Sequence, residues 1–199
     1  RRILSRLRSP ADIQSFLDTL RYSIDDFYRC PRRVLKDRTA HCADGAVFAA
    51  AALSRLGYQP LLVDLLADRD DDHILAVFRG KQGWGAVSKS NTVGLRYREP
   101  IHRSLHELVL SYFEWYFNLE REKTLRSYSK PVDLTRFDRF NWMFDDHGVD
   151  PIMEYLERIA HRPILKPAAI KSLRSVDERC FKGGLFGTRW EGLYGYKKK

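Results

Sequence analysis

The sequence predicts an α+β fold in which one buried helix packs on a small antiparallel β-sheet, with further helices around them. Residues 42–57 are rich in alanine on almost every side and end in a glycine, as is typical of a buried helix that other elements approach closely. Three short apolar runs follow at 60–66, 73–78 and 84–87, separated by an acidic loop and a glycine-containing turn. Such runs predict consecutive strands of an antiparallel meander.

Helices are expected on both sides of this central part. Ser9 followed by Pro10 predicts a capped amphipathic helix that ends near Tyr22. The basic stretch 23–41 is predicted to be irregular, because Pro31 breaks any long helix there. Further helices are predicted at 104–117, 150–161 and 167–180.

The chain of 199 residues is expected to form a single domain over residues 1–180, with a distinct C-terminal segment over residues 181–199. In that segment glycines alternate with phenylalanine, tryptophan and tyrosine, and three lysines end it. It is interpreted either as an irregular hairpin that covers the core or as a loose tail that binds a base or a partner. We favour the covering role, because exposed aromatic side chains are unfavourable in a monomer.

Composition and charge exclude several classes of protein. The hydrophobic fraction of 44% is that of a globular chain and not of a disordered one. No run approaches the roughly 18 consecutive apolar residues of a membrane-spanning helix, so no membrane partner is expected. The net charge of +9 belongs to the two ends, residues 1–40 and 179–199. This distribution favours weak, non-specific adhesion to nucleic acid over sequence-specific recognition of it.

The three cysteines, Cys30, Cys42 and Cys180, form an odd and sparse set without the spacing of metal ligands. They are expected to be free thiols in a reducing compartment, and the protein is interpreted as cytoplasmic. Neither a metal nor another cofactor is expected.

Cys42 is the candidate nucleophile, because it lies at the expected N-terminus of the buried helix. A helix N-terminus stabilises a thiolate, and its free N–H groups can hold the oxyanion that forms when a substrate carbonyl is attacked. His73 begins a strand 31 residues later and is the candidate acid and base. The alternative is that Cys42 is an inert core residue and His73 a polar strand end.

These motifs occur in the order of a known superfamily. The segments 41–46, 72–77 and 83–87, with the alanine-rich helix between the first two, resemble the transglutaminase-like superfamily, a circularly rearranged relative of papain-like enzymes. The resemblance covers about residues 35–92. It implies that Cys42 is the nucleophile and His73 the general base and acid. In that family an aspartate usually follows the tryptophan by about four positions and orients the histidine, whereas Ser88 stands there in this chain.

The geometry of a hairpin suggests a substitute for the missing carboxylate. With a two-residue turn at 81–82, the numbers of facing residues sum to 163, so that His73 faces Ser90. A slip of one or two positions brings Ser88 or Asn91 beside the imidazole. Since an asparagine can orient a catalytic histidine, Asn91 is the first candidate and Ser88 the second. The alternative is that Asn91 is an ordinary loop residue.

Acidic residues lie close to both candidate groups. Asp44 is interpreted as a helix-start residue and not a catalytic one, because its carboxylate would oppose a thiolate. The aspartates at 70–72 would raise the pKa of His73 and favour an ion pair with the thiolate of Cys42. The alternative is a solvated loop.

The resulting hypothesis is thiol-dependent acyl chemistry, either hydrolysis of a peptide or amide or transfer of an acyl group to an amine. Cys42 would form the thioester, His73 would move the proton, and Asn91 or Ser88 would steady the ring. The substrate would be a protein, a peptide or a small amide. Two other classes stay open: a degenerate transglutaminase-like module that binds a partner, and an interaction protein that uses its basic ends and aromatic segment on nucleic acid or protein.

Overall fold

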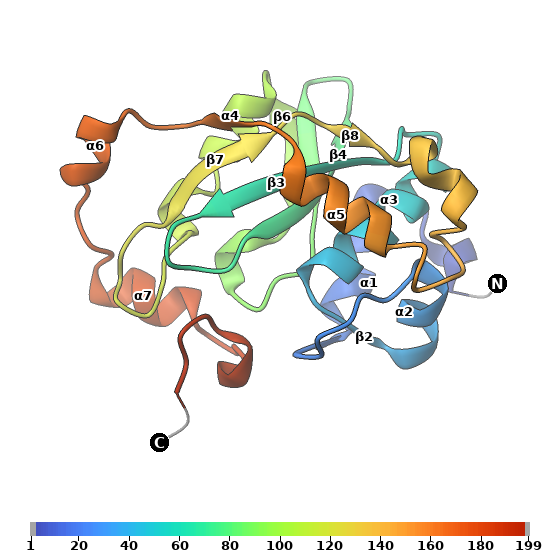
Figure 1. The fold of residues 1–199 in the computed structure, drawn as a ribbon, viewed down its shortest axis with the longest axis horizontal. Coiled ribbons are helices and arrows are strands. Elements are labelled where there is room, and N and C mark those ends of the chain that lie inside the picture. Colours follow the sequence, from blue (N-terminus) through green and yellow to red (C-terminus); the bar gives the residue numbers. More distant parts are fainter. Residues whose placement is uncertain (1–2, 198–199) are drawn as a thin grey trace.

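A computed structural model of the chain describes residues 3–197 and shows a mixed α+β fold around an antiparallel sheet of seven strands (Figure 1). The expected α+β class, with an antiparallel sheet and several helices, is therefore confirmed. The helices are α1 (Pro10–Asp18), α2 (Pro31–Asp37), α3 (Cys42–Arg55), α4 (Leu105–Leu110), α5 (Asp150–Arg158), α6 (Pro167–Lys171) and α7 (Glu178–Gly184).

The sheet has the strand order β6-β5-β4-β3-β7-β9, and β8 pairs with β3 beside β7. A separate parallel pair joins β1 to β2 near the start of α3. The strands are β1 (Arg21–Tyr22), β2 (Thr39–Ala40), β3 (Leu61–Ala67), β4 (His73–Arg79), β5 (Trp84–Val87), β6 (Arg98–His102), β7 (Leu125–Ser129), β8 (Val132–Asp133) and β9 (His161–Pro163).

The predicted meander of β3, β4 and β5 is present, and so is the predicted register of its second hairpin. Ala76 pairs with Val87 and Arg79 pairs with Trp84, so the numbers of facing residues sum to 163. The backbone N–H of Gly80 donates to the carbonyl oxygen of Gly83 at 2.9 Å and closes the turn.

The two faces of the sheet belong to two separate apolar clusters. Along β4, Ile74, Ala76 and Phe78 pack in the cluster that contains α1, α3 and α5. The alternate residues Leu75 and Val77 pack in a second cluster with α4. Helix α3 is buried because it lies between the sheet and the other helices of the first cluster, as its alanine content predicts.

Several element boundaries differ from the prediction. The helix expected at 10–22 ends at Asp18, and Pro31 begins α2 rather than only interrupting a helix, because proline fits the first helical position. The helix expected at 104–117 is complete by Leu110, and that at 150–161 ends at Arg158. Six strands were not predicted: β1, β2, β6, β7, β8 and β9.

The helix expected at 167–180 is broken into α6 and α7. Between them the chain has no regular secondary structure, and Val176 is buried against Phe117 while its N–H donates to the carbonyl of Arg121. Asp177 then caps α7 by accepting from the N–H groups of Arg179 and Cys180. Burial of one apolar side chain and a new cap therefore divide the expected helix.

The boundary expected between 180 and 181 falls inside α7. The following chain forms no hairpin but a short 3-10 turn at Trp190–Gly192, and residues 198 and 199 of the expected segment lie outside the described part. Phe181 and Leu185 pack against Phe117, whereas Phe186 is 82% exposed. The segment therefore covers the body only in part. Across residues 3–197, no helix has the length and apolar character needed to cross a bilayer.

Candidate functional site

The N-terminus of α3 is fixed by its neighbours in sequence. His41 is the N-cap residue, and its Nδ1 atom accepts from the N–H groups of Ala43 at 3.1 Å and Asp44 at 3.4 Å. The Asp44 carboxylate in turn accepts from the N–H of His41 at 3.2 Å. This reciprocal capping box places Cys42 at the first residue of the helix, as the sequence predicts.

Asp44 also ties the preceding loop to the helix. Its fully buried carboxylate accepts from the backbone N–H of Arg29 at 2.7 Å, and the Arg29 guanidinium lies 3.5 Å away. The same guanidinium pairs with Asp25 and Asp37. Burial raises the pKa of Asp44, opposed by His41 and Arg29. Asp44 is thus a helix-start residue, as predicted, and its buried arginine partner had no signal in the sequence.

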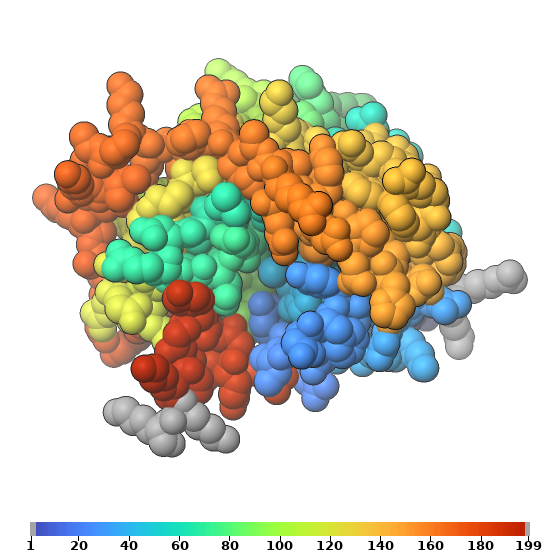
Figure 2. All heavy atoms as spheres, in the orientation of Figure 1, coloured from blue at the N-terminus to red at the C-terminus, as the bar shows by residue number. Residues whose placement is uncertain are grey.

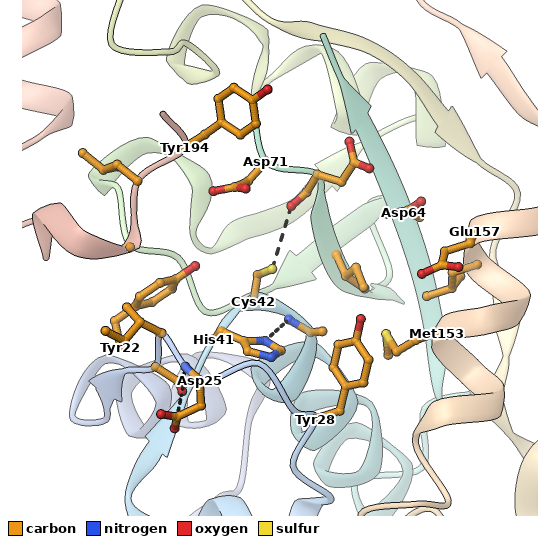
Figure 3. A pocket seen from close by; sticks show the side chains of 18 of the residues that line it. Tyr22, Asp25, Tyr28, His41, Cys42, Asp64, Asp71, Met153, Glu157 and Tyr194 are labelled. Atoms are coloured by element: carbon orange, nitrogen blue, oxygen red, sulfur yellow. Dashed lines mark hydrogen bonds between the residues drawn. The ribbon is translucent and has the colours of Figure 1, made fainter. Parts of the chain in front are cut away.

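Cys42 is partly exposed and opens on a pocket of about 610 Å³ (Figure 3). Tyr22 and Tyr28 flank the thiol on either side, and Sγ donates to the carbonyl oxygen of Asp72 at 3.8 Å. Among the described residues that line the pocket there is no lysine or arginine, but there are six carboxylates. These belong to Asp25, Asp64, Asp71, Asp72, Glu157 and Glu191.

The resting state of Cys42 differs from the expected thiolate. Burial raises the pKa of the thiol to about 12, and the carboxylates of Asp71 and Asp44 add to this effect. The backbone N–H groups of Ile74 and Ala43 act in the opposite direction but do not outweigh burial. The expectation of a lowered pKa was wrong because it left out the burial of the thiol, which is the largest effect on its pKa.

His73 begins β4 and is 4% exposed. Its Nε2 atom lies 2.9 Å from the carbonyl oxygen of Leu95 and 3.2 Å from Oγ of Ser88. A carbonyl oxygen can only accept, so Nε2 carries the proton in the neutral ring and Nδ1 is left with a free lone pair. His73 and Cys42 both line a cavity of about 60 Å³, which Tyr116 also lines.

No hydrogen bond within the described part of the chain joins the His73 ring to Cys42. Side chains alternate along a strand, so His73 shares the sheet face of Leu75, whereas α3 packs on the face of Ile74. The two groups therefore approach each other at the edge of β4, in the part of this strand that is not paired with β5, whose last paired residue is Val87. His73 and Cys42 are thus related by a shared cavity.

The charge expected on His73 is also absent. Burial lowers the pKa of its ring to about 4, and the nearby Arg98 lowers it further. The aspartates that precede it have other partners: Asp72 accepts from the N–H of Ala67, and Asp70 accepts from Oγ1 of Thr124. The expected ion pair was wrong because burial of the His73 ring disfavours its charged form. Both Cys42 and His73 are consequently neutral at neutral pH.

Ser88, and not Asn91, is the side chain beside the imidazole. Ser88 is fully buried, and its Oγ donates to the carbonyl of Leu95 at 2.7 Å. Gln14 holds its backbone through two hydrogen bonds, one to the N–H and one to the carbonyl. The side chain of Asn91 instead bonds Arg189 and Gly192. Choosing Asn91 as the orienting group was wrong: Asn91 lines the small cavity together with His73, but its carboxamide bonds the backbone of Arg189 and Gly192.

Three residues that position the site were not identified from the sequence. The carbonyl of Leu95 has no signature in a sequence, because every residue has a carbonyl group. Gln14 was visible as a polar residue in an apolar helix pattern. The buried ammonium group of Lys89 donates to the carbonyls of Leu17 at 3.0 Å and Leu20 at 2.6 Å, and so ties α1 to the segment that carries Ser88.

No model of a known protein family matches this chain, and a search of curated proteins finds no significant similarity. Within residues 3–197, no group of three or more histidine, cysteine, aspartate or glutamate side chains is arranged to hold a metal ion.

Proposed function

We propose that the protein carries out thiol-dependent acyl chemistry as a transglutaminase-like cysteine hydrolase or acyltransferase, with Cys42 as the nucleophile. The placement of the thiol carries the proposal: it opens both on the large pocket and on the small cavity that His73 lines. A thiol in this position can attack an acyl group held in the pocket while a base lies behind it. The chain order of Cys42, His73 and Ser88 agrees with the resemblance to transglutaminase-like proteins.

In the proposed reaction, Nδ1 of His73 takes the proton of the thiol while Sγ bonds to the substrate carbonyl carbon. Because both groups are neutral at rest, proton transfer accompanies the attack instead of preceding it. The C–N bond then breaks, and the imidazolium gives its proton to the leaving amine. Water resolves the thioester in hydrolysis, and a second amine resolves it in acyl transfer. Ser88 and the Leu95 carbonyl keep the ring in the required tautomer.

One backbone group is placed to stabilise the oxyanion. The N–H groups of Ala43 and Asp44 are occupied by His41 and are no longer free for a substrate, contrary to the expectation from the helix N-terminus. No hydrogen bond within residues 3–197 uses the N–H of Cys42 itself. This donor at the first helical residue is therefore the candidate to bind the developing negative charge.

The proposed function is tested with a panel of short acyl amides, using hydroxylamine as the acceptor and the acyl hydroxamate as the readout. The acidic pocket wall predicts that neutral or cationic substrates react and that anionic ones do not. Cys42→Ser and His73→Gln should each lower the rate at least about 100-fold, and Ser88→Ala roughly 10-fold. Hydroxamate formation that survives in Cys42→Ser would contradict the proposal.

A second candidate is a binding module of the same fold without chemistry. The missing hydrogen bond between Cys42 and His73 favours it, together with the neutral state of both groups. In that case an amide of the panel would bind in the pocket, and shift the melting temperature, without any hydroxamate being formed.

A further inference from the structure

The C-terminal strap, defined as residues 188–194, lies beside Cys42. Glu191, Gly192, Leu193 and Tyr194 line the large pocket together with Cys42, and the last three of them also line the small cavity. Figure 3 shows Tyr194 across the pocket from the thiol, and in Figure 2 the red C-terminal segment lies beside the blue N-terminal part. The strap is thus one wall of the candidate site.

The side chain of Asn91 holds the strap by its main chain. Nδ2 of Asn91 donates to the carbonyls of Arg189 at 2.8 Å and Gly192 at 3.0 Å, and Oδ1 accepts from the N–H of Arg189 at 3.0 Å. The Asn91 carbonyl accepts from Oγ1 of Thr188 at 3.0 Å, and the Arg189 guanidinium donates to the carbonyl of Tyr22. All three bonds of the Asn91 carboxamide go to backbone atoms, which every polypeptide has.

The apolar attachment of the strap is small. Leu193 packs beside the cluster of Phe117, Val176 and Leu185, whereas Trp190 and Tyr194 remain exposed. A segment with few buried apolar contacts opens at a low free energy, so the hydrogen bonds of Asn91 are a large part of what keeps the strap in place.

We propose that the strap occupies a polypeptide-binding groove beside Cys42, that Asn91 is the residue that binds the main chain there, and that an extended peptide substrate competes with the strap for this groove. Recognition through main-chain hydrogen bonds is the mode by which proteins bind extended peptides of varied sequence. The inference rests on the proposed function for the role of the bound peptide. Its test is independent of acyl chemistry.

Two variants of the full chain release the strap from opposite sides. Asn91→Ala removes the carboxamide from the groove. Gly192→Val acts on the strap, because a Cβ there would lie 3.1 Å from Tyr22, 3.2 Å from Asn91 Nδ2 and 3.2 Å from Ile24. Ser90→Ala is the matched control, since within residues 3–197 the Ser90 hydroxyl bonds Thr92 of its own loop and not the strap.

The first readout is hydrogen exchange of the peptide that contains Arg189, whose N–H is bound to Asn91. The second is the rate of Cys42 modification at pH 9, measured with a small methanethiosulfonate and with a bulky maleimide. For each reagent, the rate in the variant is divided by the rate in the wild type. We expect both releasing variants to exchange faster, and the bulky reagent to gain roughly 10-fold over the small one, because three hydrogen bonds are lost. The Ser90→Ala control should match the wild type in both readouts.

The third readout adds a synthetic peptide of residues 187–195. It should protect Cys42 in Gly192→Val, where the groove is intact but vacated, and not in Asn91→Ala. Unchanged exchange in both variants would overturn the role of Asn91. Faster exchange without a gain for the bulky reagent would show that the strap does not cover the thiol, and no protection by the peptide would overturn the groove. A failure of the proposed function alone would leave all three results in place.

Discussion

Helix α3 packs closely against the segment that carries Ser88 at Gly45. A Cβ added at Gly45 would lie 2.3 Å from Cβ of Lys89, where ordinary carbon contacts are about 3.5–4.0 Å. Lys89 cannot move aside without breaking its bonds to the carbonyls at the end of α1. In Gly45→Ala, α3 and this segment must therefore separate by roughly 1 Å, and such overpacking costs about 1–3 kcal/mol.

The same substitution has an opposing effect on the helix itself, since alanine favours a helix over glycine by about 1 kcal/mol. Because Lys89 is fixed at both ends, we expect the steric effect to prevail, with a net loss of about 1–2 kcal/mol in the free energy of unfolding. Gly183 in α7 is the matched control, because nothing lies within 4 Å of its added Cβ. Gly183→Ala should leave stability unchanged or raise it by up to about 1 kcal/mol.

Urea unfolding of the wild type and the two variants gives the comparison, with equal m-values as the check that one transition is compared. Gly45→Ala should also slow the proposed acyl transfer, because Cys42 moves relative to Ser88 and His73. A Gly45→Ala protein as stable as Gly183→Ala would refute the close packing of α3 on this segment.

Three further predictions concern buried polar groups. Asp44→Ala leaves the backbone N–H groups of Arg29 and His41 without their acceptor, while Asp25 and Asp37 still pair with the Arg29 guanidinium, and it should lower the free energy of unfolding by about 1–3 kcal/mol, measured by urea unfolding. Lys89→Met should lower it by about 1–3 kcal/mol, because two carbonyls of α1 lose their donor; unchanged stability would contradict that role. The pKa of His73 is about 4 in the folded protein and about 6.5 in the unfolded chain. The free energy of unfolding of the wild type, relative to that of His73→Gln, should therefore fall by up to about 3 kcal/mol as the pH falls from 6.5 to 4. If the two proteins lose stability in parallel over this pH range, the burial of a neutral ring is contradicted.

The parts of the fold that could be predicted are those in which neighbouring residues decide the structure. Alanine content and the closing glycine predicted α3 with Cys42 at its start, and the short turn predicted the register between β4 and β5. The sequence limited the side chain that orients His73 to a few residues after β5, but it could not select one of them. The selection depends on where the chain stops pairing with β4. The carbonyl of Leu95 has no sequence signal, and the contact of Asn91 with Arg189 joins residues 98 positions apart.

The charge states of Cys42 and His73 could not be predicted from the sequence, because they too depend on the packed structure. A helix N-terminus and nearby aspartates are visible in the residue order, but burial is a property of the packed structure. Here burial moves the pKa of Cys42 up and that of His73 down, so that the pair is neutral.

The central claim is that Cys42 acts as a nucleophile with His73 as its base, and peptide-resolved mass spectrometry of an acyl thioester tests it most directly. The protein is mixed with an activated acetyl ester at pH 7, stopped in acid, and the acetyl group is quantified on each of the three cysteines. We predict that Cys42 is acetylated first, faster than the exposed Cys180 and the buried Cys30, and that His73→Gln abolishes this preference. Acetylation of Cys180 ahead of Cys42, or a Cys42 rate that is the same in His73→Gln, would contradict the claim.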